Sequence, residues 1–124
     1  MRVPHTVKQN ITVSAASQVI LKHRLSGILV VDEDEQLVGM LSELDCMRAI
    51  VSAVYNGNTP GAEMVEHVMT KDVAVNHPGE DILTVAAQML SSKHRRRPLI
   101  ENGKLVGQIS CRQLLSAIKD FGGQ

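Results

Sequence analysis

The sequence predicts an α+β fold in which two pseudo-symmetric β-α-β-β-α repeats pack together as one compact module. The first observation is size, because 124 residues are enough for one compact domain with a sizeable core. The second is composition, because 44% hydrophobic and 21% charged residues are typical of a globular protein. The third is an internal repeat, in which strand-like and helix-like segments follow one another twice in the same order.

The repeat is visible by direct alignment. Residues 37–50 (LVGMLSELDCMRAI) align with residues 105–118 (LVGQISCRQLLSAI) at an offset of 68, and six of these fourteen positions are identical. Nearer the start of each copy the offset becomes 69. The stretch NGNTPG separates the copies, since Gly and Pro interrupt regular structure. We therefore predict a first repeat over residues 1–55, a linker over 56–67 and a second repeat over 68–121.

The first repeat shows the order of elements. We expect an extended segment at Thr6-Val7 and then a helix over about residues 14–24, whose apolar residues recur with a 3.6-residue period. Strands over 28–31 and 37–41 follow on either side of a polar turn. A second helix is expected to start after Ser42.

The second repeat has the same order. A short helical lead over residues 63–69 and an extended segment over 73–75 precede a helix over 81–93. Asn102-Gly103 predicts a tight hairpin turn, because both residues tolerate positive φ. The last helix is expected to start after Ser110.

Composition excludes several classes of protein. Thirteen basic residues balance thirteen acidic ones and aromatic residues make up only 2%, so we expect no nucleic-acid binding. No stretch approaches the ~20 apolar residues of a membrane span and no signal peptide opens the chain, so we expect a cytoplasmic protein without membrane contact. Cys46 and Cys111 are isolated and expected to be reduced thiols. The five histidines lack ligand spacing and no nucleophile motif is present, so we expect neither a metal site nor catalytic residues.

The repeated unit resembles the CBS domain. The resemblance is carried by residues 24–32 (RLSGILVVD), by residues 39–45 (GMLSELD), by their partners in the second copy and by Val68-Met69-Thr70. It implies a tandem pair, called a Bateman module, packed about a pseudo-twofold axis. It further implies a stand-alone regulatory module that binds an adenosyl ligand (AMP, ADP, ATP or S-adenosylmethionine) in a cleft between the repeats, requires no cofactor, forms a homodimer and signals to an effector protein.

Residues 39–45 match the ligand motif of that family. Gly39 is expected to let a ligand approach the backbone, and Ser42 lies at a helix N-terminus, which favours anions. The resemblance implies that Asp45 accepts hydrogen bonds from the ribose hydroxyls and that Met40 contacts the base, although Met40 could equally pack in the core. Ser42-x-x-Asp45 is also a capping box, and this alternative explains Ser110-x-x-Gln113 as well.

The basic residues distinguish the two copies. Residues 93–97 (KHRRR) occupy the passage from helix to strand in the second copy, whereas the equivalent RLSGI of the first copy has one charge. The resemblance implies that Arg95, Arg96 and Arg112 supply cations to the ligand held by Asp45. The alternatives are a solvated charge run at a helix C-terminus and a nucleic-acid patch. His77-Pro78 is implied to line the purine pocket, but a plain turn also explains it.

A rival interpretation is a ligand-independent interaction module. The helices after Ser42 and Ser110 carry broad apolar faces that exceed what covering their own sheet requires, and such a surplus usually marks an interface. The alternative is that all of these residues lie in the core. The residues concerned are Leu44, Met47, Ile50, Val51, Val54, Leu114, Leu115, Ile118 and Phe121.

Overall fold

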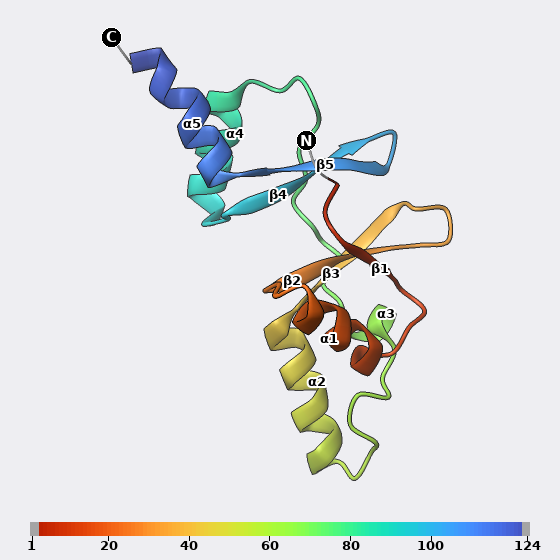
Figure 1. Cartoon of the computed structure of the whole chain (residues 1–124). Helices are drawn as coiled ribbons and strands as arrows, with labels where there is room; N and C mark the ends of the chain where they lie inside the picture. Colours follow the sequence, from red (N-terminus) through yellow and green to blue (C-terminus); the bar gives the residue numbers. More distant parts are fainter. Residues whose placement is uncertain (1–2, 123–124) are drawn as a thin grey trace. The chain divides into compact units, whose positions relative to one another are not determined.

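The structure is a computed structural model that describes residues 3–122 (Figure 1). The chain divides into two compact units, one over His5–Val73 and the other over the residues from Ala74 onwards together with those before His5. Both units combine helices with a small sheet, so the predicted α+β class is confirmed. No helix in the described part of the chain is long and apolar enough to cross a membrane.

The first unit contains three strands and three helices. Its elements are β1 (Thr6–Lys8), α1 (Val13–Lys22), β2 (Gly27–Val31), β3 (Leu37–Ser42), α2 (Glu43–Tyr55) and α3 (Val65–Val68). The sheet order is β1-β2-β3, with β1 parallel and β3 antiparallel to β2. The Thr12 hydroxyl accepts the Ala15 N–H at 3.1 Å and caps the start of α1. This helix ends two residues earlier than predicted, because Arg24 adopts a left-handed φ of 54°.

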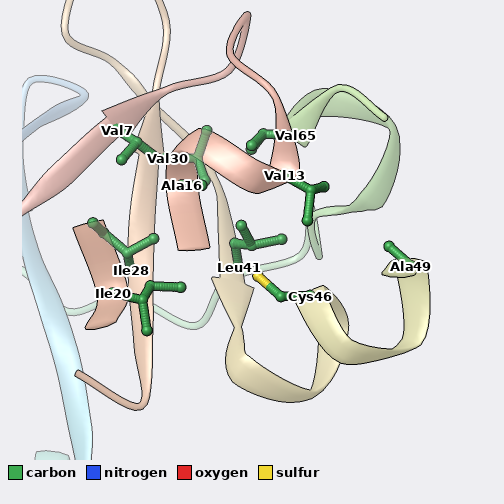
Figure 2. Close-up of a cluster of buried hydrophobic side chains, with 10 residues drawn as sticks. All are labelled: Val7, Val13, Ala16, Ile20, Ile28, Val30, Leu41, Cys46, Ala49 and Val65. Atoms are coloured by element: carbon green, nitrogen blue, oxygen red, sulfur yellow. The ribbon is translucent and has the colours of Figure 1, made fainter. Parts of the chain in front are cut away.

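The core of the first unit lies between the sheet and its helices (Figure 2). Figure 2 shows Cys46 and Ala49 of α2 directed into a cluster of aliphatic side chains from α1, β2 and β3. Val65 of α3 is fully buried in the same cluster. The buried residues of the cluster are Val7, Val13, Ala16, Ile20, Ile28, Val30, Leu41, Cys46, Ala49 and Val65.

The segment after α3 closes the free edge of β3. The Met40 N–H donates to the Thr70 carbonyl at 2.9 Å, and the Thr70 N–H donates back to the Met40 carbonyl at 2.9 Å. The helix predicted over residues 63–69 is shorter than expected, since α3 covers only Val65–Val68. It belongs to the first unit. Residues that the repeat alignment assigns to the second copy complete the sheet of the first.

The second unit contains two helices and a hairpin. Its elements are α4 (Ile82–Ser92), β4 (Arg96–Glu101), β5 (Lys104–Ser110) and α5 (Cys111–Gly122). The hairpin turn is confirmed, because Asn102 and Gly103 have φ of 54° and 79°. Asp81 caps α4 by accepting the Thr84 N–H at 3.0 Å.

The extended segment predicted over residues 73–75 forms no strand in the structure. Only Asn76 pairs with β4, through Asn76 N–H to Pro98 O at 3.0 Å and Ile100 N–H to Asn76 O at 2.9 Å. In the first unit the next bond of the ladder runs from Gln9 N–H to Val31 O. Gln9 aligns with Pro78, and proline has no N–H to donate, so the ladder stops there.

Candidate functional site

The motif of the first unit lies where β3 passes into α2. The Ser42 N–H donates to Asp45 Oδ2 at 2.9 Å, and the Asp45 N–H donates to Ser42 Oγ at 3.0 Å. The capping box considered for these residues is therefore formed. The other carboxylate oxygen of Asp45 accepts Arg48 Nη1 at 3.1 Å, and because the Arg48 side chain is 72% exposed this contact is the easier one to exchange for a ligand hydroxyl.

The space beside Gly39 is filled by the chain itself. A Cβ at this position would lie 2.5 Å from Met69 Sδ and 2.9 Å from the Thr70 carbonyl oxygen. The close approach of this segment, rather than of a ligand, explains the glycine. Met40 is 40% exposed and is not a core residue, and its Cε lies 3.3 Å from where a Cβ on Gly27 would be.

Three basic residues of the second unit meet at one end of its hairpin. Arg96 is paired with Ser110 in the β4–β5 register, and the Arg95 carbonyl accepts the Cys111 N–H at 2.9 Å. Arg112 follows in the first turn of α5, and all three arginines are exposed. Among the side chains that the structure describes, none of the three forms an ion pair. Their charges are therefore available to an anion.

The acid and the cations belong to different units. In the second unit Gln113 takes the place of Asp45, accepting the Ser110 N–H at 2.9 Å and donating its own N–H to Ser110 Oγ at 3.2 Å. In the first unit the uncharged pair Ser26-Gly27 takes the place of Arg95-Arg96, and Glu43 N–H bonds to Ser26 O at 2.9 Å. The structure thus gives each unit one half of the predicted ligand contacts.

His77 and Pro78 lie at the opposite end of β4 from Arg95 and Arg96. His77 Nδ1 is 2.8 Å from the carbonyl oxygen of Ile100, which is the equivalent of Val31. The imidazole therefore takes over the bond that a backbone N–H makes in the first unit. Arg96 and Ile100 are four positions apart along β4, a span of about 13 Å. The second unit brings the three arginines together and holds His77-Pro78 apart from them.

Two polar residues that the sequence analysis did not single out are buried here. Arg97 is 7% exposed and Asn76 is 2% exposed, and Arg97 Nη1 donates to Asn76 Oδ1 at 3.4 Å. In the sequence, Arg97 forms one basic run with its exposed neighbours. Its position directly before the buried Pro98-Leu99-Ile100 stretch of β4 is the signal that could have identified it as an inward residue.

Comparison with known proteins gives one family. The family model of the CBS domain matches residues 1–52 and 65–120. An uncharacterised protein of Methanocaldococcus jannaschii is 30% identical over 105 residues, which are 85% of this chain and 36% of that protein. The chain thus spans little more than a third of the length of that relative.

Solved structures have the same fold. The CBS domain pair of protein MJ0100, solved in complex with 5′-methylthioadenosine and S-adenosyl-L-methionine, has a TM-score of 0.70 and 26% identity, with 99% of this chain and 91% of that chain covered. CBSX2 in complex with AMP has a TM-score of 0.77 and 23% identity, with 96% and 90% covered.

Proposed function

The chain belongs to the CBS domain family and carries two CBS domains in tandem, and on this premise we propose that it is a regulatory module that binds an adenine nucleotide or related adenosyl ligand. The observation that carries the proposal is the set of three exposed arginines in the second unit that form no ion pair with any side chain the structure describes. The complexes of MJ0100 with two adenosyl compounds and of CBSX2 with AMP support this class of ligand. The module acts by binding, and its output passes to an effector protein.

Each unit has its own role in this proposal. Asp45, with Ser42 at the N-terminus of α2, accepts the sugar hydroxyls, and Met40 contacts the base. Arg95, Arg96 and Arg112 bind the negatively charged end of the ligand. Hydrogen bonds to charged groups contribute about 1.5–3 kcal/mol each. Micromolar binding needs about 8 kcal/mol. Hydrogen bonds from three arginines and to one carboxylate are therefore enough for micromolar binding.

A thermal unfolding assay tests the proposal. A ligand that binds only the folded state at 100 times its Kd stabilises that state by about 2.7 kcal/mol. We expect at least one of AMP, ADP, ATP and S-adenosylmethionine to raise the melting temperature of the wild type. The double variant Arg95→Ala/Arg96→Ala should lose this increase. The matched control Lys104→Ala/Lys119→Ala removes two exposed positive charges from the same unit and should keep it. No increase with any of the four compounds contradicts the proposal.

A second function, self-association, is favoured by the outer face of α2. This helix directs small residues, Cys46, Ala49 and Ala53, into its own core. Large apolar side chains lie on the opposite face with 50–65% exposure, at the 3-4-3 spacing of a helix-to-helix seam. These residues are Leu44, Met47, Val51 and Val54. In α5, by contrast, Leu114 is buried and Leu115 is 69% exposed, while the side chain of Phe121 lies outside the described residues.

We propose that α2 of a second copy of the chain covers this seam. A self-complementary seam fits a symmetric dimer, because the same surface then serves both partners. Light scattering should give the mass of a dimer for the wild type and of a monomer for Met47→Glu/Val51→Glu. The control Glu43→Gln/Arg48→Gln, at exposed polar positions of the same helix, should remain dimeric. A monomeric wild type would exclude the dimer.

A further inference from the structure

The guanidinium of Arg97 is buried. It forms no ion pair among the side chains that the structure describes. Its five hydrogen bonds run to neutral groups: Nε to His94 Nδ1 at 3.2 Å, Nη1 to Asn76 Oδ1 at 3.4 Å and Gln88 Oε1 at 3.3 Å, and Nη2 to Gln88 O at 3.5 Å and Ser92 Oγ at 3.1 Å. A buried charge is costly unless its donors are satisfied, so this network is a specific arrangement.

The end of α4 supplies part of the compensation. Gln88 and Ser92 belong to the last turns of this helix, where unpaired carbonyl groups carry partial negative charge. The Arg97 guanidinium is satisfied there by groups of its own unit. It is therefore not available to a ligand as Arg95 and Arg96 are.

One branch of the network fixes the loop that contains His77 and Pro78. Asn76 Nδ2 donates to Gln88 Oε1 at 2.8 Å and to Glu80 Oε2 at 3.3 Å, and the other oxygen of Glu80 accepts the His77 N–H. The His77 N–H is the main cause that lowers the pKa of Glu80, with burial acting in the opposite direction. Arg97 therefore holds this loop through Asn76.

The other branch fixes the passage from α4 to β4. Arg97 Nε donates to His94, which directly precedes the two exposed arginines. The His94 carbonyl in turn accepts Cys111 Sγ at 3.5 Å, next to the bond from Cys111 N–H to Arg95 O. Bonds from β4 and α5 thus hold the passage on both sides.

We propose that Arg97 is an interior positioning residue that, without contacting ligand, holds the His77-Pro78 loop and the Arg95-Arg96 passage in one fixed arrangement. The inference rests on the proposed function for its consequence, since both segments are proposed ligand contacts. A local network of this kind predicts that its loss loosens two segments distant in sequence while the rest of the unit stays closed.

Amide hydrogen exchange of the protein without ligand tests the arrangement. In Arg97→Met, which removes all five donor bonds, we expect the amides of residues 76, 77, 79 and 80 and of residues 94–96 to exchange at least about tenfold faster. Amides of β5 should exchange at the wild-type rate. In Arg97→Lys, which keeps the charge and some donors, the two segments should exchange at rates between those of the wild type and Arg97→Met. Val85→Ala, a core change in α4, is the control and should accelerate exchange across the whole unit. The proposal is overturned if Arg97→Lys and Arg97→Met accelerate amide exchange equally across the whole unit, or if neither variant accelerates it.

Ligand titration tests the consequence. At a temperature where the variants are folded, the Kd of the compound that stabilises the wild type most among AMP, ADP, ATP and S-adenosylmethionine should rise at least about tenfold in Arg97→Met and less in Arg97→Lys. The Kd of Val85→Ala should not change. An unchanged Kd in Arg97→Met overturns the positioning role. If none of the four compounds binds the wild type, the proposed function fails, and hydrogen exchange still decides whether Arg97 couples the two segments.

Discussion

The imidazole rings of His5 and His23 stack, with their centroids 3.8 Å apart and 20° between their planes. His23 is the C-cap of α1 and His5 directly precedes β1, so the stack joins the start of the first unit to the end of its first helix. Burial is the main cause that lowers the pKa of His23, and the charges of His5 and Lys22 add to it.

This stack predicts that the first unit loses stability in mild acid. A histidine with a lowered pKa in the folded state binds its proton more readily in the unfolded chain, so the free energy of unfolding increases with pH. The contribution is complete above about pH 6.5 and declines as the pH drops from there towards the lower pKa of the folded state. Urea midpoints between about pH 5 and about pH 8 should show the slope in the wild type and a smaller slope in His23→Asn. His67→Asn, at an exposed position of α3, should keep the wild-type slope.

Glu80 predicts a second, more acidic loss of stability in the other unit. Its pKa is lowered in the folded state, mainly by the bond from the His77 N–H. The stabilisation is therefore present above the unfolded value of about 4.5 and is lost as the pH falls through the folded pKa. Urea midpoints between about pH 3 and about pH 6 should fall less steeply in Glu80→Gln than in wild type. Glu101→Gln, at the exposed end of β4, serves as the control, and equal slopes in all three proteins would refute the assignment.

Gly39→Ala should destabilise the first unit. The new methyl group would meet Met69 Sδ at 2.5 Å and the Thr70 carbonyl at 2.9 Å, and the backbone contact cannot be relieved by a rotamer change. Overpacking of this kind typically costs about 1–3 kcal/mol in the free energy of unfolding. Gly27→Ala, whose nearest neighbour would be Leu41 O at 3.1 Å, should cost less in the same denaturant titration. The reverse order would show that the Met69-Thr70 segment is not tightly held.

Substitutions of Asp45 separate capping from ligand binding. Asp45→Ala removes the acceptor of the Ser42 N–H and should lower the free energy of unfolding by about 0.5–2 kcal/mol. Asp45→Asn keeps one acceptor oxygen and should be close to wild type in stability, yet lose most of the stabilisation by the adenosyl ligand because the charge is gone. Gln113→Ala, the equivalent capping change in the second unit, should reduce stability and leave ligand stabilisation intact. If Asp45→Asn retains the full ligand effect, Asp45 is only a cap.

Much of the fold could be predicted because it depends on local signals. The helix after Ser42 and the hairpin at Asn102-Gly103 follow from capping and turn chemistry and are confirmed. The extended segment over residues 73–75 forms no strand, and pairing with β4 is limited to Asn76. Beyond Asn76, Pro78 cannot make the ladder bond that Gln9 makes in the first unit. Two positions that carry a backbone N–H in the first copy, Gln9 and Leu29, are occupied by proline in the second copy, at Pro78 and Pro98.

The site was less accessible to sequence reasoning. The sequence distinguishes a copy with an acid from a copy with cations, and the structure shows that the arginines are exposed and unpaired within the described residues. It does not distinguish Arg97 from Arg95 and Arg96, because the inward orientation of Arg97 depends on Asn76 and Gln88 far along the chain. The outward orientation of the large residues of α2 likewise depends on how the whole helix packs.

The pairing of Thr70 with Met40 determines where this chain can be divided. A fragment that stops at the end of the first copy would leave an unpaired β3 edge and an unfilled space beside Gly39, and bare edges of this kind recruit other strands. A fragment that continues to Val73 retains the segment with Thr70 that pairs with the edge of β3. A division of the chain that leaves the first unit intact must therefore fall after Thr70.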